Sequence, residues 1–173
     1  MKVLVTGAAG FIGRNLITEL QRQEGVSVLP YEVDTPRELL DQYCAECDFV
    51  YNLAGVNRPE HVEEFMEGNF GFATTLVDTL KRHGNNCPIM NSSSIQAALE
   101  NPYGQSKKAG VDMLYAYGQD VGAPIYTYRF PNVFGKWCRP NYNSAVATFC
   151  HNIAHGLPIQ VNDRSTVMHL VYI

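Results

Sequence analysis

Short apolar runs alternate with longer amphipathic segments along this chain. Four of the runs are typical of buried strands, at residues 2–6, 26–31, 49–53 and 87–91. The segments between them repeat their apolar residues at helical spacing, as in residues 11–20. Strands that alternate with helices predict a parallel sheet covered by helices on both faces, which is an α/β fold.

The second half of the chain continues the alternation. A helix is expected from Pro102 to about residue 119, then a strand at 125–130 and a helix from Asn143 to about residue 155. Two further strands, at residues 158–161 and 167–173, should be joined by a polar turn. Because no helix follows the last apolar strand, we expect residues 1–173 to be part of a longer protein, incomplete on its C-terminal side.

A glycine-rich turn follows the first strand, with the spacing Gly7-x-x-Gly10-x-x-Gly13. Gly7 would allow the tight turn, and Gly13 would let the next helix pack closely. Gly10 would let a pyrophosphate approach the backbone at the helix N-terminus. The sequence therefore predicts a dinucleotide site here, which also includes Phe11 and Ile12.

The charged residues after the second strand bear on the choice of cofactor. An acidic residue at this position binds the ribose hydroxyls of NAD, whereas a nearby Arg accommodates the 2′-phosphate of NADP. Glu32 and Asp34 favour NAD(H), while Arg37 favours NADP(H). The capping-box pattern at residues 35–38 gives Arg37 a purely structural explanation as well. These residues leave both cofactors open.

Small or polar residues end the third and fourth strands. Leu53, Ala54 and Gly55 leave room for a cofactor, since ligands in open α/β sheets lie at the carboxyl ends of the strands. Arg58 lies in the polar loop that follows. The serines at 92–94 either end a strand or supply a hydroxyl to a substrate oxygen.

Tyr103 and Lys107 share one face of the helix that begins after Asn101 and Pro102. An ammonium near a phenol should lower the pKa of the phenol, and a tuned phenol can exchange a proton with an alcohol or carbonyl oxygen. The simpler interpretation is a core aromatic residue beside a solvated lysine. The pair alone does not decide between them.

The bulk composition excludes several classes of protein. The chain has 173 residues, 46% hydrophobic content and a formal net charge of −4, which argues against a nucleic-acid or membrane-surface binder. Its five cysteines lack disulfide-scaffold spacing, so we expect a reduced, cytoplasmic protein. We expect no zinc or redox role for Cys44-x-x-Cys47, because no second pair accompanies it. No metal site is expected.

The joint pattern resembles the extended short-chain dehydrogenase/reductases. The motifs that carry the resemblance are the glycine turn, Asn52-Leu53-Ala54-Gly55, Ser92-Ser93-Ser94, Tyr103-x-x-x-Lys107 and Arg129-x-Pro131-Asn132-Val133-Phe134-Gly135. The segment from Phe134 to Ser144 resembles the reductase domain of CapF-type capsular polysaccharide enzymes more closely. The resemblance implies a Rossmann-type doubly wound sheet. It also implies a second, cupin-type epimerase domain outside residues 1–173, and a homodimer.

The resemblance also implies roles for individual residues. Tyr103 would be the acid/base, Lys107 would hold the nicotinamide ribose, and Ser94 would orient the substrate oxygen. Asn69 would lie near that site, and Asn132 would reach the sugar nucleotide. Pro131 would belong to the cofactor site. Further substrate contacts would come from Arg58, Lys136 and Arg164.

The implied reaction is reduction by NADPH of a C4 keto group on a UDP-linked amino-deoxy sugar, on the route to UDP-N-acetyl-L-fucosamine. A C4 epimerase or a 4,6-dehydratase is an alternative, although Ile95 and Gln96 stand where a dehydratase usually has acidic residues. A non-catalytic NAD(P)-binding module is the other alternative. Such modules commonly lose the tyrosine and lysine, and both are present here.

Overall fold

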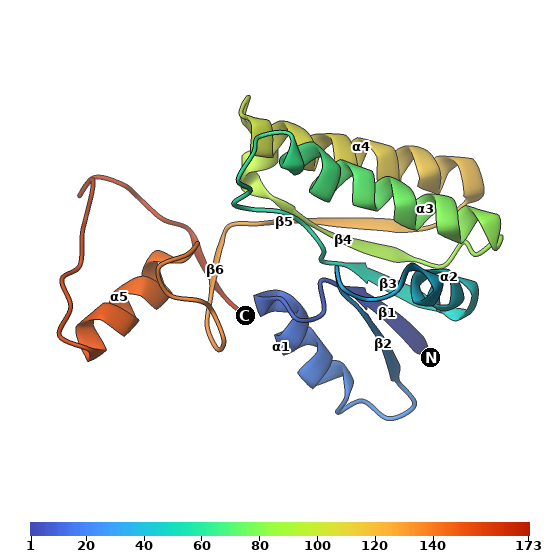
Figure 1. Ribbon diagram of the computed structural model, residues 1–173, viewed down its shortest axis with the longest axis horizontal. Coiled ribbons are helices and arrows are strands. Elements are labelled where there is room, and N and C mark those ends of the chain that lie inside the picture. The colour runs from blue at the N-terminus through green and yellow to red at the C-terminus, as the bar shows by residue number, and fades with distance from the viewer. The chain divides into compact units, whose positions relative to one another are not determined.

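A central sheet of five strands organises the first part of the chain (Figure 1). Its strands, in the order β2-β1-β3-β4-β5, are β1 (Lys2–Thr6), β2 (Ser27–Tyr31), β3 (Phe49–Asn52), β4 (Ile89–Ser94) and β5 (Ile125–Phe130). β1 pairs in parallel with β2 and with β3, and β3 pairs in parallel with β4. The chain therefore reverses its direction of winding between β1 and β3, where doubly wound sheets bind ligands.

The computed structural model describes residues 1–173 in two units, Met1–Arg129 and Phe130–Ile173. In the first unit, α1 (Phe11–Leu20) lies on one face of the sheet (Figure 1). The opposite face carries α2 (Arg37–Glu46), α3 (Phe72–Arg82) and α4 (Pro102–Val121). This arrangement confirms the expected Rossmann-like sheet with helices on both faces.

The alternation of side chains along β1 explains how both faces are filled. Leu4 packs in the core that α2, α3 and α4 cover, which includes Leu76 and Leu114. Val3 and Val5 point the other way, into a smaller cluster with residues of α1. All three β1 side chains are fully buried.

Two short helical segments lead into the candidate site. η1 (Met66–Gly71) is a π-helix that runs directly into α3, and η2 (Ile95–Ala98) is a 3₁₀ turn between β4 and α4. π-Helical turns are rare and are found frequently at functional sites. The start of α4 forms as expected, because Asn101 Oδ1 accepts a hydrogen bond of 2.7 Å from the Gly104 N–H.

The second unit contains α5 (Ala145–Ala154) and a two-stranded sheet of β6 (Asn132–Phe134) and β7 (Leu170–Tyr172). The expected strand at 158–161 is wrong, since those residues form no strand and β7 pairs in parallel with β6 instead. Pro158 has no N–H to donate, and its carbonyl accepts a hydrogen bond from Asn152 Nδ2 at 2.9 Å. No helix of the protein is long and apolar enough to cross a membrane.

Candidate functional site

The glycine-rich turn has one open position and two closed ones. A Cβ on Gly13 would lie 2.2 Å from the Gly7 carbonyl oxygen, and one on Gly7 would lie 2.9 Å from Ala54 N. Gly7 also adopts a φ of +65°, which favours glycine. A Cβ on Gly10 would meet only the Gly7 carbonyl oxygen, at 3.1 Å. Gly7 and Gly13 therefore shape the turn, while exposed Gly10 leaves the helix N-terminus accessible to a pyrophosphate.

The side chain of Glu32 lies against this turn, where its Oε1 accepts a hydrogen bond from the Ala9 N–H. The expected capping box is wrong. Thr35 Oγ1 accepts from Glu32 N at 2.9 Å and leaves the end of α2 without a side-chain cap. Arg37 is exposed at the first position of α2, and its charge opposes the effect of burial, which raises the pKa of Tyr31.

Ser94, Tyr103 and Lys107 come together at the carboxyl end of β4. Tyr103 lies in the first turn of α4 and forms a hydrogen bond with Ser94, the last residue of β4. Lys107, one turn further along, has its Nζ 6.0 Å from the centroid of the Tyr103 ring. The ring of Phe65 packs against Tyr103 with 5.6 Å between the centroids. The structure thus brings together the hydroxyl, the phenol and the amine that the sequence singled out.

The pKa values of this group differ from the expectation that Lys107 lowers the pKa of Tyr103. Burial raises the pKa of Tyr103, and only the hydrogen bond with Ser94 acts in the opposite direction. Lys107 is itself buried, and loss of solvation lowers its pKa to about 8. Burial disfavours the charged form of each group, so both are held closer to neutrality.

Asn69 joins the loop after β3 to the start of α4. Its Oδ1 accepts from Val56 N at 3.1 Å, while its Nδ2 donates to the Val56 carbonyl at 3.1 Å and to Ser106 Oγ at 3.0 Å. Ser106 Oγ then donates to the Tyr103 carbonyl at 2.8 Å. Asn69 is therefore buried rather than at the surface, and it positions the helix turn that carries Tyr103.

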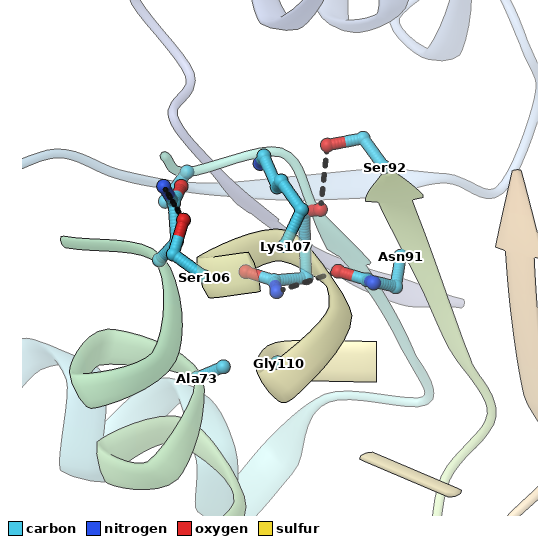
Figure 2. Close-up of a pocket in the computed structure, with 9 residues that line it drawn as sticks. Ala73, Asn91, Ser92, Ser106, Lys107 and Gly110 are labelled. Carbon is cyan, nitrogen blue, oxygen red and sulfur yellow. Dashed lines mark hydrogen bonds between the residues drawn. The ribbon is translucent and has the colours of Figure 1, made fainter. Parts of the chain in front are cut away.

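A small polar cavity lies beside these residues (Figure 2). Its volume is about 10 Å³, and its polar lining comes from Asn52, Asn69, Asn91, Ser92, Ser106 and Lys107. Asn52 Nδ2 donates to Asn91 Oδ1 at 3.0 Å, and Ser92 Oγ donates to the Asn52 carbonyl at 3.2 Å. The figure shows Ser106 and Lys107 entering from α4 and Asn91 and Ser92 from β4.

Gly55 has a different role from the expected one of leaving room for a cofactor. A Cβ at Gly55 would lie 2.8 Å from Lys107 Nζ and 2.7 Å from Asn69 Oδ1, so the missing side chain gives space to these polar groups. The preceding residues are held by Thr6, whose Oγ1 accepts from Leu53 N at 3.1 Å and Ala54 N at 3.2 Å.

The remaining predicted residues are not joined to Tyr103 by the described contacts. Arg58 is exposed in the loop beyond Gly55. The others belong to the second unit, and their roles stay predictions: Pro131, Asn132, Lys136 and Arg164. No group of three or more His, Cys, Asp or Glu side chains is placed to hold a metal ion.

The sequence analysis missed several residues that shape the site. Ser106 lies inside the Tyr103-to-Lys107 motif but carries no separate signal in one sequence. Gly104 lets the first turn of α4 pack against η2, because its Cβ would lie 2.3 Å from the Gln96 carbonyl oxygen. Phe65 and Asn91 are recognisable only once the chain is folded.

The parallel sheet, the glycine turn after β1 and the Ser94, Tyr103 and Lys107 cluster define a Rossmann-type protein of the short-chain dehydrogenase/reductase class. Residues 3–173 match the model of the NAD dependent epimerase/dehydratase family, and the chain belongs to that family. The family binds NAD(P).

Individual relatives are substantially longer than this chain. It is 50% identical, over all 173 residues, to a UDP-2-acetamido-2,6-beta-L-arabino-hexul-4-ose reductase of Pseudomonas aeruginosa, and covers 46% of it. It is also similar to the capsular polysaccharide assembling protein CapF of Staphylococcus aureus, with 45% identity and a TM-score of 0.89 over 99% of this chain and 47% of that one. The chain thus spans about half the length of these relatives.

A more distant structure shares the fold alone. A UDP-glucuronic acid 4-epimerase from Bacillus cereus, solved with UDP-glucuronic acid and NAD, has 20% identity and a TM-score of 0.86. The match covers 99% of this chain and 69% of the epimerase.

Proposed function

We propose that the protein reduces the C4 keto group of a UDP-linked amino-deoxy sugar with a nicotinamide cofactor, in the synthesis of a capsular or surface polysaccharide precursor. The observation that carries the proposal is the hydrogen-bonded pair of Ser94 and Tyr103 beside buried Lys107. The 50% identity to a reductase of a UDP-linked hexul-4-ose supports this substrate class.

Each residue of the cluster has a distinct task in this reaction. Ser94 orients the C4 oxygen by a hydrogen bond, and Tyr103 donates the proton that turns this oxygen into a hydroxyl. Lys107 holds the nicotinamide ribose, with its amine placed by the space beside Gly55. The bound cofactor supplies the hydride that reduces C4.

We propose NADPH as the preferred donor, following the resemblance to the CapF-type reductases, with Arg37 as the partner of its 2′-phosphate. One observation favours NADH instead. Glu32 places a carboxylate on the glycine-rich turn, where it would repel a 2′-phosphate. Calorimetric titration with each cofactor tests the choice. Tighter binding of NADPH supports it, and a tenfold preference for NADH would overturn it.

The substrate's nucleotide would be held by residues of the second unit, Asn132, Lys136 and Arg164, together with Arg58. A homodimer is also part of this proposal, as is a cupin-type domain beyond residues 1–173. Sedimentation of the complete protein distinguishes a dimer from a monomer.

An assay with the complete protein separates reduction from the alternatives. The protein is incubated with a UDP-2-acetamido-2,6-dideoxy-4-ketohexose and NADPH, and the product is analysed by NMR. A reductase consumes one NADPH for each C4 hydroxyl that forms. An epimerase would interconvert C4 hydroxyl sugars without net consumption of cofactor, and a dehydratase would release water from a hexose substrate. Either of these results would contradict the proposal.

A further inference from the structure

Two buried cysteines lie side by side at the amino ends of β3 and β4, the edge of the sheet opposite the site. Cys47 ends α2 just before β3, and Cys87 lies two residues before β4. Val50 N donates to the Pro88 carbonyl at 3.0 Å, which fixes the two entry segments against each other. The Sγ atoms of the two cysteines are 3.7 Å apart, although 40 residues separate them in the sequence.

Asn85 holds both cysteines in place. Its Nδ2 donates to the Cys47 carbonyl at 2.9 Å and lies 3.6 Å from Cys47 Sγ. Its Oδ1 accepts from Cys87 N at 3.0 Å. The Asn85 carbonyl in turn accepts a hydrogen bond from Tyr117 OH at 3.0 Å. One anchored amide therefore keeps the two thiols adjacent.

We propose that Cys47 and Cys87 form a reversible disulfide when the protein meets a peroxide. The thiolate of Cys87 attacks one peroxide oxygen, breaks the O–O bond and becomes a sulfenic acid as one water leaves. Cys47 then attacks the sulfenic sulfur, the S–S bond forms and a second water leaves. Overall, two thiols are oxidised and one hydrogen peroxide is reduced to two waters. The sulfurs must close to about 2.05 Å, which is within reach of side-chain rotation.

The environment of the thiols assigns these roles. The Cys47 thiol donates its hydrogen bond to Cys87 Sγ, which lowers the pKa of Cys87 and raises that of Cys47. Cys87 is 8% exposed, so its sulfur is the more accessible to a small oxidant, and Cys47 is 4% exposed. Nearby Cys44 is fully buried, and burial raises its pKa to about 12, so it stays a thiol.

The disulfide would tie β3 to β4 across a loop of 40 residues, far from Tyr103. Such a cross-link restricts the unfolded chain and stabilises the folded one. We therefore expect the oxidised protein to melt roughly 5–10 °C higher than the reduced one, with unchanged affinity for the cofactor.

The test is peptide mapping of the peroxide-treated protein. The protein is alkylated in denaturant with N-ethylmaleimide, digested without reductant and analysed by mass spectrometry. A peptide pair linked through Cys47 and Cys87, which dithiothreitol separates, is the expected result. Cys87→Ser should abolish the link, whereas Cys44→Ser and Cys150→Ser should keep it.

Two results would overturn the proposal. One is that Cys47 and Cys87 remain fully alkylated at a peroxide dose that oxidises exposed Cys150. The other is that the linked peptide contains Cys44 in place of either cysteine. Because mapping of the wild-type protein gives both answers, the test does not depend on the serine variants folding.

Discussion

Lys107 is a buried amine in the polar cavity beside the site. Its Nζ lies against the backbone of Gly55, and burial lowers its pKa from the ordinary 10.5 to about 8. Below pH 8 the lysine is charged in both the folded and the unfolded protein, so folding must bury the charge. The site therefore keeps this amine at a cost in stability.

We predict that Lys107→Met stabilises the cofactor-free protein at pH 7, by about 2 kcal/mol, because the substitution removes that buried charge. Between about pH 8 and 10.5 the unfolded lysine binds a proton that the folded one lacks, so the stability of the wild type rises with pH. The advantage of the methionine variant should shrink across this window. Urea denaturation at pH 7 and pH 10 measures it, and an equal advantage at both values would contradict the account.

Single residues also show what the sequence could and could not predict. The importance of Tyr103 and Lys107 followed from their spacing on one helix face. The direction of the pKa shift of Tyr103 did not, because burial depends on neighbours such as Phe65 that are distant in sequence. Ser106 escaped notice for the same reason, since its partner Asn69 lies 37 residues away.

At the scale of elements, the start of α4 positions the catalytic cluster. Its first turn packs on η2 so closely that a Cβ on Gly104 would lie 2.3 Å from the Gln96 carbonyl and 2.5 Å from the Leu99 carbonyl. Backbone oxygens cannot move aside as a flexible side chain can. The position of Tyr103 beside Ser94 thus depends on a glycine in the helix.

We predict that Gly104→Ala displaces the first turn of α4, destabilises the protein by roughly 1–3 kcal/mol and lowers turnover at least tenfold. Gly110→Ala on the same helix is the control. Its Cβ would be 3.4 Å from the nearest atom, the Asn69 carbonyl oxygen, so it should keep or slightly raise stability. Urea melts and NADPH oxidation measure both variants, and identical behaviour of the two would rule out the packing argument.

The turn between β1 and α1 gives a second test at this scale. Gly10→Val adds bulk where a pyrophosphate should approach, while the side chain meets little of the protein. We predict at least tenfold weaker NADPH binding by calorimetry, with a melting temperature within a few degrees of wild type. Gly13→Ala should show the opposite pattern of first losing stability, because its Cβ would lie 2.2 Å from the Gly7 carbonyl oxygen. Unchanged affinity in Gly10→Val would place the cofactor elsewhere.

At the scale of the whole molecule, the sequence predicted the main sheet better than the second unit. Alternating strands and helices of ordinary length indicated β1 to β5 and the helices on both faces. The apolar run of β7 was also visible, but its partner β6 was not, because strand pairing over long sequence distances is not written in local periodicity. The chain covers 46% of its P. aeruginosa relative, so activity should be measured on the complete protein.

The most direct test of the central claim, that Tyr103 is the proton donor, is turnover of Tyr103→Phe in the complete protein. The account predicts that NADPH oxidation with the 4-keto UDP-sugar falls roughly 10²–10⁴-fold, while the dissociation constant for NADPH stays within about threefold of wild type. Tyr115→Phe, an exposed tyrosine on the same helix, should behave as wild type. Turnover of Tyr103→Phe within threefold of wild type would contradict the account.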